Sequence, residues 1–262
     1  MSLILSELRL RRASLIVWTV SIALLVLMIV GVYPSIRDNT SLNAIYGDIS
    51  QSAQQLLGGS DLTSPVGYLS TQLFAFFLPA VILVFVLGRC AATIAGEEED
   101  RTLDLLLAQP LARPAAYLEK AAAIAIGLLV VTLSVVIPLL AFNSAVKFDL
   151  PVADVSAVVV QMYLFCLALG VWTQAICAAF GRRGVGLGIV VGYIVVSYLV
   201  YGLSASIPLL MHLRPLSLWR WFLGNDPLQN GFGAAECLVL VVTIAVGLGA
   251  GVWLFGRRNL HA

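Results

Sequence analysis

One stretch of this chain, GEEEDRTLDLLLAQPLARPAAYLEK (residues 96–120), holds six of the fourteen acidic residues and lies between two long hydrophobic runs. Within it, Leu103, Leu106 and Leu107 fall on one face of a helix, while the acids cluster at the start. Residues of these types at this spacing are suited to binding a protein partner through an amphipathic helix. The alternative is a solvated charged connector whose basic residues only anchor the neighbouring hydrophobic runs. Charge alone leaves both interpretations open.

Residue types that carry catalysis are scarce in the rest of the chain. The two histidines, His212 and His261, are too few and too far apart for a zinc site of the His-Glu-x-x-His kind. The sequence GLSAS around Ser204 lacks the closing glycine and the preceding strand of a nucleophile elbow. We therefore expect no catalytic, metal-binding or cofactor-binding residue, and a hydrolase that uses Ser204 is the weakest alternative.

Two common ways of powering transport are also missing from the sequence. No Asp or Glu falls in the middle of a hydrophobic run, so a proton-driven or ion-driven mechanism lacks its usual carboxylates. A phosphate-binding loop ends in Gly-Lys-Ser/Thr, whereas Lys120 follows Glu119 and Lys147 follows Val146. Any work driven by ATP therefore requires another polypeptide, and we expect ATP and Mg²⁺ to bind there.

The elements that must position the charged stretch are membrane helices. The 262 residues are 60% hydrophobic and 11% charged, and their net charge of +1 argues against nucleic-acid binding. We predict an all-α membrane protein with a single transmembrane domain over residues 1–262, in which Pro79 and Pro138 kink the second and third spans. Six hydrophobic runs are long enough to cross about 30 Å of hydrocarbon as helices, namely residues 14–32, 69–95, 121–142, 155–180, 185–207 and 235–255.

The placement of lysine and arginine predicts the orientation of these spans. With the N-terminus inside, eleven basic residues lie on the inner side and four on the outer side. Both termini and residues 96–120 are therefore expected in the cytoplasm. The inner residues are Arg9, Arg11, Arg12, Arg89, Arg101, Arg113, Lys120, Arg182, Arg183, Arg257 and Arg258, and the outer ones are Arg37, Lys147, Arg214 and Arg220.

Three further segments flank the spans. Residues 1–12 mix leucines with charged residues, as expected of a helix that lies at the membrane interface among the lipids. The outer segment 33–68 is polar. The outer segment 208–234 is too broken by prolines to span, yet too rich in Trp219, Trp221 and leucines to lie in water. We predict one or two short re-entrant helices there, and an aromatic belt without a further role is the alternative.

Glycines spaced four residues apart predict close helix packing. Gly184, Gly188 and Gly192 share one face of the fifth span, and Gly247 and Gly251 repeat the spacing in the sixth. A face of bare backbone lets a neighbouring helix approach closely. Packing within the bundle and contact with a second subunit both fit this pattern.

The charged stretch resembles the cytoplasmic connector of type-2 ATP-binding cassette (ABC) exporter permeases. In that family a glutamate run, Thr-Leu, an acid, a leucine triplet, Pro-x-x-Arg and a later lysine recur. Near the C-terminus, PLSLWRWFLGNDPLQNG resembles the outer helical segment before the last span, and WLFGRRNL resembles the usual basic terminus, so the resemblance covers nearly the whole chain. The matching connector positions are Glu97, Glu98, Glu99, Thr102, Leu103, Asp104, Leu105, Leu106, Leu107, Pro110, Arg113 and Lys120.

The connector departs from the family pattern in two places. Asp100 and Arg101 precede Thr102, where the family usually has a basic residue and then glycine. Glu119 stands where a glycine is common. These differences affect the start of the predicted helix and the surface that a partner would meet.

The resemblance implies a six-span permease half with an interfacial elbow helix first and the connector as its coupling helix. Two such halves, identical or paired with a sister subunit, pack together on separately encoded ATPase subunits. Closure of the ATPases on ATP is then transmitted to the spans. The implied function is ATP-driven export across the inner membrane of a prokaryotic cell, for cargo such as drugs, antibiotics, lipids, polysaccharides or ions. Two alternatives stay open: a mechanotransmission subunit that passes no solute, and a membrane scaffold without energy coupling.

Overall fold

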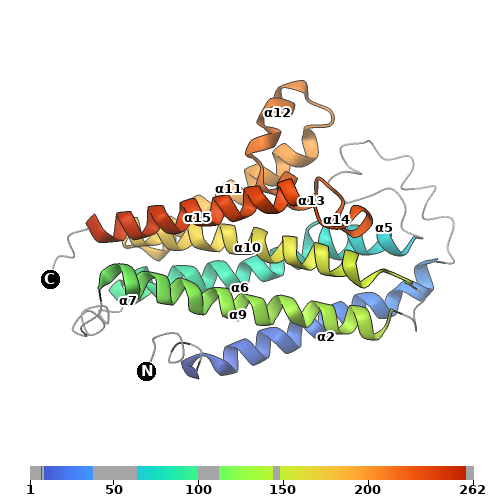
Figure 1. Ribbon diagram of the computed structural model, residues 1–262, viewed down its shortest axis with the longest axis horizontal. Coiled ribbons are helices and arrows are strands. Elements are labelled where there is room, and N and C mark those ends of the chain that lie inside the picture. The colour runs from blue at the N-terminus through green and yellow to red at the C-terminus, as the bar shows by residue number, and fades with distance from the viewer. Residues whose placement is uncertain (1–6, 8, 38–63, 100–111, 144–147, 258–262) are drawn as a thin grey trace.

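The computed structural model describes residues 7, 9–37, 64–99, 112–143 and 148–257, and every regular element in these residues is helical (Figure 1). Six of the described helical segments are long and apolar enough to cross a membrane. They confirm the prediction of an all-α chain with six such spans. The segments are α2 (Arg12–Arg37), the unit formed by α5 (Pro65–Leu69), the π-helix η1 (Ser70–Phe74) and α6 (Phe77–Thr93), then α9 (Arg113–Ala141), α10 (Val152–Phe180), α11 (Arg183–Leu203) and α15 (Ala234–Arg257).

Helix α10 forms the centre of the bundle. It packs against α15, α6, α9 and α11, and 67% of its most apolar stretch is buried. A helix that is apolar on all sides can be surrounded by other helices or by lipid, and here other helices surround most of α10. The helix ends at Gly181, whose left-handed φ of 65° lets its N–H bond the Cys177 carbonyl at 2.8 Å. The chain then turns directly into α11.

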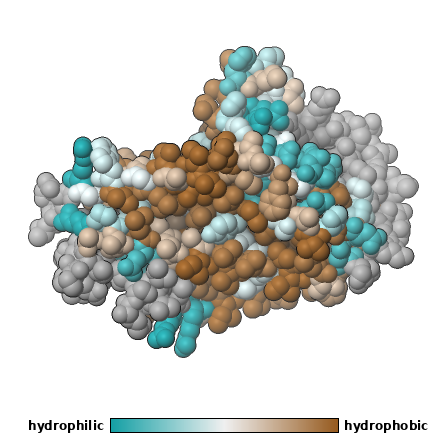
Figure 2. Space-filling model, viewed as in Figure 1, coloured by the Kyte–Doolittle hydropathy of each residue, from teal (hydrophilic) through white to brown (hydrophobic). Residues whose placement is uncertain are grey.

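The other helices leave much of their apolar surface uncovered. Only 17% of the most apolar stretch of α2 is buried, and 22% of those of α11 and α15. Figure 2 shows a broad hydrophobic band across the middle of the bundle and hydrophilic side chains gathered toward its ends. Such a band matches the hydrocarbon layer of a membrane, and it leaves faces available to lipid or to another subunit.

One end of the bundle, which we call the connector end, carries the ends of the charged stretch. Helix α2 begins there, α15 ends there, and α7 (Ala95–Glu99) lies beside the first turn of α9 (Figure 1). Residues 1–6 and 8 lie outside the described residues, so the N-terminal interfacial helix stays a prediction. Residues 33–37 of the predicted outer segment continue α2, and residues 38–63 lie outside the described residues.

The second span is irregular close to Pro79, where the sequence predicted a kink, but not at the proline itself. Pro79 lies inside α6, but the irregularity is one turn earlier, at η1 and at Phe76, whose φ is −149°. Proline lacks the N–H that would bond the carbonyl of the fourth preceding residue, and its ring crowds that carbonyl. The distortion therefore appears before the proline. Pro138 instead lies in the last turn of α9, which ends at Ala141.

Helix α9 begins earlier than predicted, at Arg113 and not at residue 121. Ala112 is extended and a proline follows Arg113, which is a favourable helix start because proline in the first turn loses no hydrogen bond. The last eight residues assigned to the connector, 113–120, are thus the first two turns of this span. Lys120 consequently lies inside the bundle.

The segment between α11 and α15 contains the short helices that the sequence predicted. Two of its aromatic residues do more than line the membrane interface, because they are buried against Phe165 of α10. The ring centroid of Phe165 lies 4.8 Å from that of Trp219 and 5.1 Å from that of Phe222. The segment also folds back along α11, since the Tyr193 hydroxyl donates to the Leu216 carbonyl at 2.8 Å. Its elements are α12 (Pro208–Leu213), the 3-10 helix η2 (Arg214–Leu216), α13 (Leu218–Leu223) and α14 (Pro227–Asn230).

The two glycine patterns lie in different surroundings. A Cβ added at Gly247 would lie 2.9 Å from the Val171 side chain, and one at Gly251 would overlap the Tyr117 hydroxyl. Close approach of α15 to α9 and α10 therefore requires glycine at these two positions. An added Cβ would meet open space at the three glycines of α11, namely Gly184, Gly188 and Gly192.

We expect Gly251→Ala to destabilise the protein by about 1–3 kcal/mol, because Tyr117 has to move to admit the methyl group. The melting temperature of the purified protein in detergent measures this effect. Gly249→Ala is the matched control, since a Cβ there meets open space in the described residues, and it should change stability by less than about 0.5 kcal/mol. Equal melting temperatures for the two variants would contradict the close packing.

Candidate functional site

The structure describes the two ends of the charged connector. Residues 100–111 lie outside the described residues, so the predicted coupling helix and its residues Thr102, Leu103, Asp104, Leu106, Leu107 and Pro110 stay predictions. Glu97, Glu98 and Glu99 lie in α7, although the Glu98 side chain is also outside the described part. Arg113 is the exposed first residue of α9.

Lys120 joins α9 to the first end of the connector. Its side chain is only 1% exposed, and its Nζ forms an ion pair with Oε1 of Glu97. The same Nζ donates to the Thr93 carbonyl at 3.1 Å. Thr93 ends α6, where the last carbonyls of a helix lack partners within the helix. One ammonium group therefore satisfies both the end of α6 and a carboxylate of α7.

Arg183 joins α11 to the same region. Its Nε lies 2.8 Å from Oε2 of Glu99, and its backbone N–H donates to Oε1 of Glu99 at 2.9 Å. The guanidinium also donates to the Gly96 carbonyl at 3.2 Å. A Cβ at position 96 would lie 3.2 Å from the guanidinium carbon of Arg183, which is a tight contact. Glycine at this position therefore leaves room for the guanidinium.

The Glu99 carboxylate also acts at the start of α11. The residue before that helix, Arg182, makes no side-chain capping bond. The first N–H groups of a helix lack partners within the helix and attract negative charge. Glu99 supplies this charge from a different helix, so α7 and α11 are held together by charge and by backbone hydrogen bonds.

Together these contacts form a joint, which we define as Thr93, Gly96, Glu97, Glu99, Lys120 and Arg183. The joint connects α6, α7, α9 and α11 at the point where the connector leaves and re-enters the bundle. A force on the connector would therefore reach three of the six spans directly. The joint contains no cofactor-binding or nucleophilic arrangement in the described residues. It consists of ion pairs and hydrogen bonds that hold helices together.

Sequence reasoning identified only part of the joint. It placed Glu97, Glu99 and Lys120 among the coupling residues, but it did not connect Lys120 with Glu97 inside the bundle. It also counted Arg183 only as a basic residue on the inner side. Arg183 lies 84 positions after Glu99 in the sequence, and periodicity along the chain cannot pair residues so far apart. The available signal was the short turn GRR before the fifth span, which puts a basic residue at a helix start.

The fold and this joint define a membrane protein with a charged link between its spans. The chain belongs to the family described as ABC-2 family transporter protein, whose profile matches residues 1–260. The predicted resemblance to type-2 ABC permeases is thereby confirmed. Members of this family are membrane components of transporters and are not themselves catalytic. The chain matched none of the curated proteins with which it was compared.

We expect Glu97→Ala to destabilise the protein by about 3 kcal/mol, because it leaves the buried Lys120 ammonium without its carboxylate. The double variant Glu97→Ala with Lys120→Met should be more stable than Glu97→Ala alone, since no unpaired charge is left. Melting temperatures in detergent measure both effects. Glu7→Ala is the control: its ion pair with Arg11 is at the surface of one helix, and surface pairs contribute about 0–1 kcal/mol. A double variant that is less stable than the single one would contradict a paired Lys120.

Proposed function

We propose that this chain is the permease subunit of an ATP-driven ABC exporter, coupled to separate ATPase subunits through residues 96–120. The observation that carries the proposal is the joint in a chain of this family. A connector tied to three spans by Lys120, Glu97, Glu99 and Arg183 suits the transmission of force into the bundle. A connector that was only a solvated loop would have no need of a buried ion pair at its base.

The distribution of basic residues supports a cytoplasmic position for this connector. In the described residues, the arginines of the opposite end are Arg37, at the end of α2, and Arg214 and Arg220, in the segment between α11 and α15. Basic residues near span ends favour the cytoplasmic side. Those at or near the connector end are Arg9, Arg11, Arg12, Arg89, Arg113, Lys120, Arg182, Arg183 and Arg257.

The open glycine face of α11 supports assembly with a second permease subunit. A Cβ added at Gly184, Gly188 or Gly192 would meet no atom of the described residues within 4 Å, and α11 is among the least buried spans. Spaced glycines are favoured where the backbones of two helices approach within a membrane. We propose that a second copy or a sister subunit packs on this face, so that two halves enclose the translocation path.

We expect Leu106→Asp with Leu107→Asp to abolish co-purification with the ATPase subunit encoded beside this chain. Charge on the leucine face would prevent burial of that face against the partner. Ala108→Asp is the control, because it adds an aspartate to another face of the predicted helix and should keep the ATPase bound. Undiminished binding by the double variant would contradict docking through the leucine face.

Vesicle transport separates the exporter from its two rivals. ATP-dependent movement of cargo is expected for the exporter. A mechanotransmission subunit would bind the ATPase and respond to ATP without moving solute. A membrane scaffold would tolerate the double aspartate variant without any loss of function.

We expect Gly188→Phe to weaken self-association, because a large side chain separates the two backbones at the proposed contact. Intermolecular cross-linking in membranes measures the loss. The melting temperature of the single chain should change little, since an added side chain at this position meets open space. Gly31→Phe on α2, also in open space, is the control. Equal cross-linking by both variants would contradict α11 as the subunit contact.

A further inference from the structure

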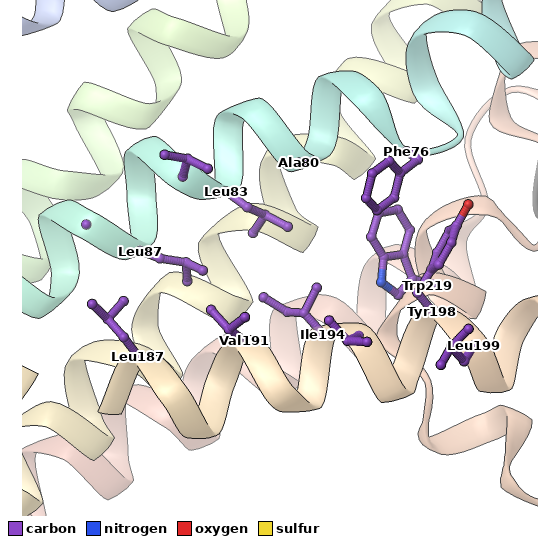
Figure 3. Close-up of a pocket in the computed structure, with 13 residues that line it drawn as sticks. Phe76, Ala80, Leu83, Leu87, Leu187, Val191, Ile194, Tyr198, Leu199 and Trp219 are labelled. Atoms are coloured by element: carbon purple, nitrogen blue, oxygen red, sulfur yellow. The ribbon is translucent and has the colours of Figure 1, made fainter. Parts of the chain in front are cut away.

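Helix α6 has two faces of different character. One face borders an apolar groove between α6 and α11, to which Leu83 and Leu87 contribute (Figure 3). None of the described residues that line this groove is charged. Arg89 follows Leu87 by two residues, and successive helical residues are rotated by about 100° around the axis. Arg89 therefore lies on the opposite face of α6, about 200° from Leu87.

The face of α6 that carries Arg89 lies beside the start of α2. The rings of Phe85 in α6 and Trp18 in α2 are 5.5 Å apart between centroids. Arg89 comes four residues after Phe85, and Arg11 comes seven residues before Trp18, so each arginine is on the same side of its helix as the ring. Backbone hydrogen bonds of the helical type continue through Arg11. Both arginines are thus displaced from the two rings toward the connector end.

The charges of these side chains are not balanced. The Nε of Arg11 lies 3.5 Å from a carboxylate oxygen of Glu7, and the charges of both residues act on Arg89. One carboxylate therefore serves two guanidinium groups. Among the residues that the structure describes, the Arg89 side chain forms no ion pair and no hydrogen bond. We call Arg11 and Arg89 the arginine pair.

The arginine pair lies at the edge of the apolar part of the bundle. Arg89 is one turn before Thr93, the last residue of α6, and both arginines are half-buried. Long basic side chains near the end of a span extend to the headgroup level of the membrane. The neighbouring surface of α2 is apolar and uncovered, since Ile16 and Val17 are exposed. A lipid can therefore lie along α2 with its headgroup beside the pair.

We propose that the arginine pair binds the phosphate group of an anionic phospholipid, whose acyl chains lie along the exposed surface of α2. Two guanidinium groups with one carboxylate lack one negative charge, and a phosphodiester supplies it. Guanidinium groups bind phosphate oxygens through paired N–H groups, and basic pockets between spans bind anionic headgroups. Free phosphate has the same chemistry at the headgroup, but no apolar part that would cover α2.

This inference does not depend on the proposed exporter function. The lipid would connect the start of α2 with the end of α6, because one phosphate would contact an arginine from each helix. It would also remove the repulsion between the two like charges. Binding can be measured without ATP and without the ATPase, so its failure would leave the proposed coupling intact.

Native mass spectrometry of the purified full chain in an uncharged detergent tests the proposal. The chain is titrated with phosphatidylglycerol, which is anionic, and separately with phosphatidylcholine, whose ammonium group balances its phosphate. We expect the first phosphatidylglycerol to bind at least about 5-fold more tightly than phosphatidylcholine. Arg89→Gln should raise the dissociation constant of phosphatidylglycerol about 5-fold, the value of one basic residue near the membrane surface.

Two further variants make the result specific. Glu7→Gln removes the carboxylate that competes with the phosphate, so it should tighten phosphatidylglycerol binding about 2- to 5-fold. A gain in affinity cannot come from misfolding, and this variant therefore tests the proposal independently of Arg89→Gln. Arg182→Gln is the control, because it removes the same charge from an exposed position before α11. It should change the dissociation constant by less than about 2-fold.

Three outcomes would overturn the proposal. Equal dissociation constants for Arg89→Gln and Arg182→Gln would indicate only a general attraction between a basic surface and anionic lipid. Unchanged or weaker binding by Glu7→Gln would show that no phosphate competes with this carboxylate. Complete displacement of phosphatidylglycerol by millimolar inorganic phosphate would assign the arginine pair to free phosphate.

Discussion

The structure depends on one electrostatic constraint, which is that the ammonium of Lys120 lies among apolar helices and must be paired there. An unpaired charge at this depth would cost several kcal/mol, so the carboxylate of Glu97 and the Thr93 carbonyl have to stay within reach. Pairing fixes α9 against the end of α6 and the start of α7. Because α6 and α9 are the two spans that the connector joins, their relative position at the connector end is set by charge, whereas apolar packing alone would allow sliding.

This constraint divides the bundle into a fixed part and a freer part. Helices α6, α9, α10 and α15 pack closely, and the close approach at Gly247 and Gly251 allows little displacement of α15. Helix α11 differs, because its apolar surface is mostly uncovered and its polar contacts with other segments lie at its start and along its second half. Arg183 holds its start to α7, while Tyr193 and Ser197 bind the outer segment at Leu216 and Ser217. A helix held in this way can tilt when its start is displaced, with less loss of packing than the other spans would suffer.

Sequence reasoning predicted the spans well because each one is a long apolar run, and length and composition are local properties. The coupling role of Glu97, Glu99 and Lys120, which rests on a recurring motif, stays a prediction. Sequence reasoning failed where the outcome depends on contacts between distant segments. The start of α9 at Arg113 was assigned to the connector because Glu119 and Lys120 are charged, and only the pairing of Lys120 with Glu97 shows how charge is accommodated inside the bundle. Arg183 was missed for the same reason. The glycines of α11 and α15 looked alike in the sequence, yet the structure buries one set and leaves the other open.

The outer segment packs against both parts of the bundle. Trp219 packs on Phe165 of the central helix α10, and it also lies against Phe76 of α6 and Tyr198 of α11. Its ring therefore contacts both the fixed part and the freer part of the bundle. If α11 tilts about its start at Arg183, the distance between Tyr198 and Phe76 changes, and the packing around Trp219 changes with it. Under the proposed function, a displacement at Glu99 on one side of the membrane would thus alter the aromatic contacts of Trp219, through a single helix that contacts both places.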